Sequence, residues 1–325
     1  MSGAMALQAL TRGAVCASLA ALSLVWLPLR VTADEGAVQR AFSSPGAAGE
    51  ALVAALKADD PAALSQVLGS SVVSLLTSGD PIADQQEYRR FVSAYDLDHH
   101  WSALEEGTAM LAVGKDGWPF PIPLVDGEGG WHFDGARGAD EIVNRRIGSN
   151  ELGAIQACLA FVDAEREYYR RNPRGREMPE YARFILSGEG EKDGLYWESA
   201  AGETPSPLGR AYAVARSQGY AYDQGESKPF HGYLYRVLHA QGPAAPGGAY
   251  DYVQGDEMTR GFALVAWPAK YDASGVTTFI VNQLGLVYEK DLGPETGKIA
   301  KSLPAFDPDD SWDIVSDKAR ALPAS

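Results

Sequence analysis

The chain has 325 residues, of which 43 are acidic and 28 are basic, and its formal net charge is −15 with neutral histidines. Nucleic-acid binding needs a concentrated lysine and arginine face, and no such run is visible, so nucleic acid is excluded as an expected partner. The same charge disfavours attraction to anionic lipid, and the length suits two ordinary domains or one large one.

Residues 1–33 have the layout of a secretory signal peptide. Arg12 precedes a mostly apolar stretch over residues 14–29, and Ala33, with Val31 two places before it, fits the small-residue cleavage rule. The alternative is an uncleaved membrane anchor, but serine, proline and arginine interrupt the run of roughly 20 apolar residues that a spanning helix needs. We therefore expect a periplasmic or secreted protein with no stable membrane span after cleavage.

Cysteine use points to a fold without disulfides. Cys16 lies in the predicted signal peptide, so Cys158 would be the single thiol of the mature chain. A lone cysteine cannot form an intramolecular disulfide, and stability must then come from core burial. Cys158 lies among Ile155, Leu159 and Val162, which favours a core position over a role as nucleophile.

Residues 34–138 are predicted to form an α+β domain. A capping residue followed by proline announces helix starts at Ser44–Pro45, Asp60–Pro61 and Asp80–Pro81. Strands are then expected over residues 110–113, 118–125 and 131–133, and the prolines of the middle segment indicate an edge or bulged strand. Helices followed by a curved antiparallel hairpin resemble, in their order alone, the cone of the nuclear-transport-factor-2-like (NTF2-like) fold.

A cone of that kind often holds a pocket between its helices and its sheet. The candidate lining residues share aromatic or imidazole side chains, and they are Trp101, Trp118, Trp131, His99, His100 and His132. The alternative is that these side chains simply close the core. Adjacent histidines point in different directions on either a helix or a strand, so the His99–His100 pair indicates no metal site.

Residues 139–325 are predicted to form a second α+β domain. A short helix from Glu141 would end at Gly148, and a longer helix would begin at a cap formed by Asn150. Further helices are expected around residues 181–186 and over residues 208–217. Strands are predicted over residues 230–240, 250–253, 261–267, 277–281 and 286–288. One long helix packed on an antiparallel meander would bury the apolar faces of both.

Four stretches carry a family resemblance. They are DGWPFPIP at residues 116–123, NRRIG at residues 144–148, GPAAPGGAYDY at residues 242–252 and YEKDLGP at residues 288–294. These motifs resemble the exported bacterial family catalogued as domain of unknown function 2950 (DUF2950), over nearly the whole predicted mature chain. The resemblance implies a cell-envelope or secreted protein, and that family carries no established activity to transfer.

The C-terminal half is also similar to the globular heads of type IV pilin and pseudopilin subunits. The long helix, the strand pair around residues 261–266 and 278–282, and the closing residues 285–288 carry this similarity. A pilin helix continues backward into an apolar N-terminal stalk that polymerises, whereas a separate domain precedes the helix here. The resemblance therefore implies a pilin-like head that acts as an adaptor or binding module rather than as a filament subunit.

The sequence favours a non-catalytic function. It contains no zinc-protease, nucleophile-elbow, phosphate-loop or dinucleotide motif. Its richest aromatic and polar cluster consists of Tyr196, Trp197, His231, Tyr233, Tyr235, Asp251 and Tyr252. Exposed tyrosine and tryptophan beside carboxylates form stacking platforms, so we expect a binding or adaptor module for a glycan, a peptide or an envelope protein.

Two other interpretations of these residues stay open. The alternative function is an envelope hydrolase in which Asp251 orients His231 as the general base and Ser206 or Ser274 is the nucleophile. The cluster can also be purely structural.

The acidic residues near the C-terminus are candidates for a calcium site. Hard cations prefer clustered carboxylates, which Asp307, Asp309 and Asp310 supply. The loop lacks the glycine and terminal glutamate of a helix-loop-helix calcium site, and Pro308 indicates an ordinary turn. We therefore predict no metal site and no cofactor.

Overall fold

The computed structural model describes residues 38–76, 78–200, 202–217 and 228–316. These described residues belong to one compact unit, and the predicted signal peptide lies outside them. The unit is an α+β fold that combines helices with mostly antiparallel sheets, as predicted. No helix within the described ranges is both long and apolar enough to cross a membrane.

The described chain opens with the helices α1 (Pro45–Ala58), α2 (Pro61–Leu68), α3 (Ser70–Leu75) and α4 (Pro81–Leu97). Three of them begin at the predicted caps. The hydroxyl of Ser44 accepts the Ala47 N–H, while the carboxylates of Asp60 and Asp80 each accept two backbone N–H groups at the start of α2 and α4. These bonds satisfy donors that have no partner within a helix, which explains why each helix starts where the sequence predicts.

The first sheet has the order β1-β2-β4-β5, with β3 also paired to β2. Its strands are β1 (His99–Glu105), β2 (Thr108–Val113), β3 (Trp118–Pro119), β4 (Leu124–Gly127) and β5 (Gly130–Phe133). The strand predicted over residues 118–125 is split into β3 and β4, because prolines between them cannot donate ladder hydrogen bonds. The helices and this sheet enclose a core that includes Leu52, Leu64 and Phe133.

A single helix, α5 (Gly135–Arg171), replaces the two helices predicted around Gly148. That prediction is wrong because burial of residues on both sides, such as Ile142 and Ile155, outweighs the cost of one exposed helical glycine. Asn150 is not a cap but lies inside α5, where its Nδ2 donates to the carbonyl of Ser274 at 2.9 Å.

Two glycines of α5, Gly148 and Gly138, should respond to alanine with opposite signs. A Cβ at Gly148 meets no atom within 4 Å, so Gly148→Ala is expected to raise the free energy of unfolding by about 1 kcal/mol. A Cβ at Gly138 would lie 2.9 Å from both the Cα of Ile122 and the carbonyl oxygen of Pro121, so Gly138→Ala should destabilise the fold. Urea unfolding measures both changes, and equal signs would contradict a continuous α5.

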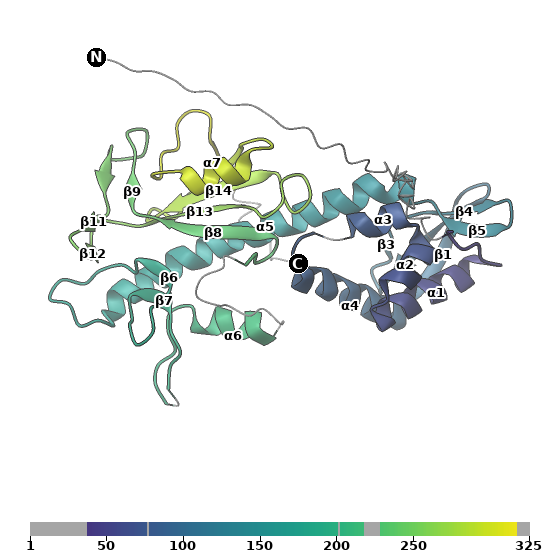
Figure 1. Cartoon of the computed structure of the whole chain (residues 1–325), viewed down its shortest axis with the longest axis horizontal. Coiled ribbons are helices and arrows are strands. Elements are labelled where there is room, and N and C mark those ends of the chain that lie inside the picture. Colours follow the sequence, from purple (N-terminus) through teal and green to yellow (C-terminus); the bar gives the residue numbers. More distant parts are fainter. Residues whose placement is uncertain (1–37, 77, 201, 218–227, 317–325) are drawn as a thin grey trace, which may run out of the picture. The chain divides into compact units, whose positions relative to one another are not determined.

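The larger sheet has the order β16-β15-β14-β13-β8, and neighbouring strands are antiparallel. Its strands are β8 (Tyr233–Leu238), β13 (Ala263–Pro268), β14 (Thr277–Asn282), β15 (Val287–Asp291) and β16 (Asp313–Ile314). Helix α5 packs on β13, β14 and β15, and α7 (Thr296–Ser302) packs on β13 from the opposite face (Figure 1). The predicted helix on an antiparallel meander is confirmed, whereas α7 and β16 were not predicted.

Shorter elements complete this half of the chain. They are β6 (Phe184–Leu186), β7 (Gly194–Tyr196), α6 (Gly209–Ser217), β9 (Ala240–Gln241), β10 (Tyr250–Asp251), β11 (Val253–Gln254) and β12 (Glu257–Met258). The helix predicted around residues 181–186 is wrong, since Tyr181 bridges to Met258 and the following residues pair with β7 as the strand β6. Phe184 and Ile185 are residue types that favour strands.

Candidate functional site

An apolar groove with a volume of about 830 Å³ lies on the face of the larger sheet that α5 covers. Its walls come from α5, β6, α6 and the edge strand β8. The apolar lining consists of Ala157, Ala160, Phe161, Phe184, Ile185, Leu186, Leu208, Ala211, Tyr212, Ala215, Phe230, Tyr235, Val237 and Leu264. A concave site of this size and apolar character is typical of ligand-binding sites.

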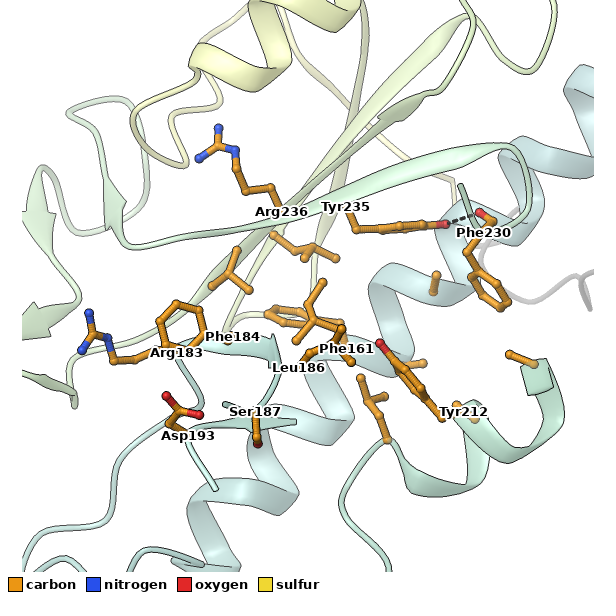
Figure 2. A pocket seen from close by; sticks show the side chains of 18 of the residues that line it. Phe161, Arg183, Phe184, Leu186, Ser187, Asp193, Tyr212, Phe230, Tyr235 and Arg236 are labelled. Atoms are coloured by element: carbon orange, nitrogen blue, oxygen red, sulfur yellow. Dashed lines mark hydrogen bonds between the residues drawn. The ribbon is translucent and has the colours of Figure 1, made fainter. Parts of the chain in front are cut away.

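Two charged side chains of the groove, Arg183 and Asp193, lie at one end (Figure 2). Figure 2 also shows Tyr212 and Phe230 at the other end, with Phe161 and Leu186 between. Arg183 donates to the carbonyl of Asp256 at 3.2 Å, while its Nε is buried without a hydrogen-bond partner. The ring of Phe184, which is 42% exposed, lies under the Arg183 guanidinium at 5.5 Å.

A second pocket, of about 680 Å³, lies on the opposite face of the sheet beside β8. It is lined by Lys228, Pro229, Leu234, Tyr235, Arg236, Trp267 and Lys301. The Arg236 side chain donates to the carbonyls of Ala300 at 2.9 Å and Leu303 at 2.7 Å, which places it against the end of α7. Burial lowers the pKa of Arg236. The described residues of the lining include three cations and no carboxylate, so this part of the pocket is suited to an anionic group.

Two of the predicted site residues lie at the apolar groove. Tyr235 lines it directly, and its hydroxyl donates to the carbonyl of Phe230 at 3.2 Å. Tyr196 supports the wall from behind, because its ring stacks on that of Tyr212 with centroids 4.1 Å apart. The structure therefore brings these two tyrosines toward one site.

The other predicted aromatic residues lie elsewhere. Tyr233 and Tyr252 are fully buried, and their hydroxyls donate to the Thr277 carbonyl at 2.9 Å and to Gln241 Oε1 at 3.0 Å. Trp197 packs against the same core, and its Nε1 is buried without a partner. Tyr233 and Tyr252 have no open face on which a ligand could stack, so the predicted seven-residue platform does not form one surface.

His231 and Asp251 are not brought together. His231 lies in the turn before β8, whereas Asp251 pairs with Ala240 beyond the other end of this strand. Six strand residues separate the two positions, or about 20 Å. Burial lowers the pKa of His231, and the carboxylate that opposes this shift is Asp80 rather than Asp251.

The candidate nucleophiles are occupied in local structure. Ser274 donates to the Lys270 carbonyl at 3.1 Å and accepts the Lys270 N–H at 3.0 Å, while Ser206 donates to the Trp197 carbonyl at 3.1 Å. Cys158 is fully buried, as predicted, and burial raises its pKa to about 12, which disfavours the reactive thiolate. The geometry gives no support to the hydrolase interpretation.

The acidic C-terminal residues hold loops. Asp307 accepts the Ala244 N–H at 2.7 Å and so fixes the glycine-rich GPAAPGGAYDY loop, and Asp309 accepts the Ser311 N–H at 2.9 Å. Within the part of the chain that the structure describes, no cluster of three or more His, Cys, Asp or Glu residues is placed to bind a metal ion.

The six aromatic and imidazole residues proposed for a pocket in the predicted first domain line neither of these two pockets. His99 stacks on Tyr95 with centroids 3.8 Å apart, and Trp118 lies exposed beneath Arg145 at 4.2 Å. Trp101 packs against the core with its Nε1 buried.

Sequence reasoning missed Arg183, Phe184 and Arg236 as site residues. The sequence predicted a helix where the structure has the strand β6, so the side chains of β6 that face the groove could not be identified. The alternation of Tyr235, Arg236 and Val237 in β8 was a usable signal, because successive strand residues point to opposite faces of a sheet.

No curated protein and no solved structure matches the chain. Residues 39–315 match the family DUF2950, described as a protein of unknown function. This match covers most of the chain and includes every element that forms the two pockets. The chain therefore belongs to the DUF2950 family.

Proposed function

We propose that the protein is a non-catalytic binding or adaptor module of the cell envelope, exported by the predicted signal peptide, and that the apolar groove is its binding site. The observation that supports this most is the groove of about 830 Å³, whose lining is largely apolar and aromatic. Covering such a surface with an apolar ligand removes it from water, which is favourable.

The charge around the groove favours an anionic ligand. The chain carries 43 acidic and 28 basic residues, yet among the described residues the groove is bordered by Arg183, Lys228 and Arg236 and by one carboxylate, Asp193. That carboxylate already accepts the Gly188 N–H at 3.1 Å. The local charge is thus opposite in sign to the net charge of the protein, which selects ligands electrostatically.

Among the expected ligand classes, the groove suits an apolar peptide segment or protein partner better than a glycan. Sugars require many converging hydrogen-bond groups, whereas polar groups here are engaged within the protein. The Tyr235 hydroxyl bonds to Phe230, and the His239 Nε2 lies 3.1 Å from the carbonyl of Arg183. The hydrolase alternative is less favoured, because Asp251 lies beyond the far end of β8 from His231 and the hydroxyls of Ser206 and Ser274 donate to backbone carbonyls.

The finer fold assignments also stay proposals. We infer an NTF2-like cone for residues 34–138 from the order of helices followed by a hairpin. The pilin-head-like assignment for residues 139–325 is supported by one long helix packed on an antiparallel meander.

A bulky ring placed inside the groove should weaken binding of an apolar anion. The fluorescent sulfonate 1-anilinonaphthalene-8-sulfonate combines aromatic rings with a negative charge and reports apolar sites by its emission. Ala160 is exposed on α5 and lines the groove, so Ala160→Phe places a ring there without disturbing the core. We expect its affinity for the dye to fall by at least about tenfold, the equivalent of 1.4 kcal/mol.

The matched control is Asp163→Phe, which adds the same ring at an exposed position of α5 that does not line the groove. This variant should bind the dye as the wild type does. Circular dichroism melting would establish that both variants stay folded. Equal dye affinities for the wild type and Ala160→Phe would refute the groove as the binding site.

A further inference from the structure

The strand β8 separates the apolar groove from the basic pocket, and its outer edge carries no strand partner among the described residues apart from the bridge at Phe230. At one end, Phe230 and Tyr233 exchange two backbone hydrogen bonds, of 2.8 and 3.1 Å. At the other end, the carbonyl of His239 accepts the Tyr252 N–H at 2.8 Å. In both contacts the β8-side residue, Tyr233 or His239, has an odd number. The odd-numbered residues along β8 therefore direct their backbone N–H and C=O groups to its outer edge.

Backbone groups alternate between the two edges of a strand. The N–H and C=O groups of Val237 therefore face the outer edge, where no backbone group of the described residues pairs with them. Val237 is buried and lines the apolar groove. A half-paired residue on an edge strand can accept an added strand, and doing so satisfies polar groups that are costly to leave unpaired.

Side chains of an added strand would alternate between two chemically different pockets. On one face, Phe161, Leu186 and Leu264 supply apolar surface. On the other face, the described lining includes Lys228, Lys301, Arg236 and Trp267, and none of the described residues there is a carboxylate. Lys228 and Arg236 also border the groove. Because successive residues of a strand point to opposite faces, apolar side chains would enter the groove while acidic ones reach the basic pocket.

We propose that the ligand is an extended peptide segment in which apolar and acidic residues alternate, bound by addition to the outer edge of β8. This inference rests on the proposed binding function and specifies its ligand. Main-chain hydrogen bonds to Val237 supply a sequence-independent part of the affinity, and the two pockets supply the specificity. Charge complementarity favours glutamate or aspartate over lysine at the positions that face Lys228 and Lys301.

The test is fluorescence anisotropy with a short labelled peptide that alternates valine and glutamate, added to the full folded chain. We expect it to bind at least about tenfold more tightly than a peptide of the same composition with its valines and glutamates in two blocks. A peptide alternating valine with lysine should bind more weakly still. Methylating the backbone nitrogens of the alternating peptide should also weaken binding by about tenfold, because the methyl groups remove the donors for strand pairing.

Charge reversal of the basic pocket supplies the protein-side control. The double variant Lys228→Glu and Lys301→Glu should lose about tenfold in affinity for the glutamate peptide and gain affinity for the lysine peptide. Lys298→Glu changes an exposed lysine of α7 that lines neither pocket, and it should leave both affinities unchanged.

The outcomes separate the two proposals. Strand addition would be overturned if the alternating, block and methylated peptides bind equally, or if a long-chain fatty acid binds the same groove more tightly. The proposed function would survive either result, provided that Ala160→Phe still weakens binding in the groove. If neither the dye nor any peptide binds, the proposed function itself fails.

Discussion

Replacing Asp80 with alanine is expected to lower the free energy of unfolding by about 2–4 kcal/mol. Asp80 is 2% exposed and its Oδ1 accepts the N–H groups of Ile82 at 3.2 Å and Ala83 at 3.1 Å, which caps α4. Its Oδ2 accepts the Gly232 N–H at 3.2 Å, in the turn that leads into β8. Loss of the cap costs about 1 kcal/mol, and leaving a buried N–H unpaired costs a further 1–3 kcal/mol.

Asp60→Ala is the matched control for this substitution. Asp60 also precedes a proline, and its carboxylate caps α2 by accepting the Ala62 and Ala63 N–H groups. Both hydrogen bonds are exposed to solvent, and both stay within the start of α2. Urea denaturation of Asp60→Ala should therefore show a loss of only about 1 kcal/mol. Equal losses for the two variants would mean that the bond from Gly232 to Asp80 contributes nothing to stability.

The second large effect concerns the carboxyl of Glu165, which is fully buried in the core on α5. Burial raises its pKa well above the usual range, against the opposing effect of the Ala182 N–H that its Oε2 accepts at 2.9 Å. The folded chain therefore keeps a proton that the unfolded chain releases above about pH 4.3. Stability from this group is complete below that pH and is lost as the pH rises toward the folded-state pKa.

Glu165→Gln removes this titration while keeping an oxygen to accept the Ala182 N–H. The stability of the wild type relative to this variant should fall by about 1.4 kcal/mol for each pH unit between the unfolded and folded pKa values. Urea unfolding of both proteins at several pH values from 5 upward measures the slope. A pH-independent difference would contradict a protonated Glu165, and Glu167→Gln, on a partly exposed carboxylate of α5, is the control.

Local sequence signals predicted the elements whose ends are fixed by local hydrogen bonds. The Ser44, Asp60 and Asp80 caps placed three helix starts, because a capping side chain bonds to N–H groups two or three residues away. The strands β13 and β14 were also predicted, since each contains an apolar run of strand-favouring residues bounded by turns.

Tertiary contacts decided the elements that the sequence did not predict. Gly148 fails to end α5 because the helix gains packing on both sides of it. Asn150 bonds to Ser274, 124 positions away, and no local pattern announces such a partner. Likewise, Tyr196 and Tyr235 lie at one groove because Tyr196 stacks on Tyr212, which lines the groove together with Tyr235. The spacing of these residues in the sequence does not reveal this arrangement.

Hydrogen exchange at the Val237 amide, measured with and without the alternating peptide, tests the proposed binding site most directly. It reports on the outer edge of β8 and, through Ala160→Phe, on the groove. Because this N–H faces the outer edge of β8, the added strand should slow its exchange in the wild type. In Ala160→Phe, which fills the groove, the peptide should leave that rate unchanged. Peptide binding that protects amides only outside β8 and the groove would contradict the proposed site.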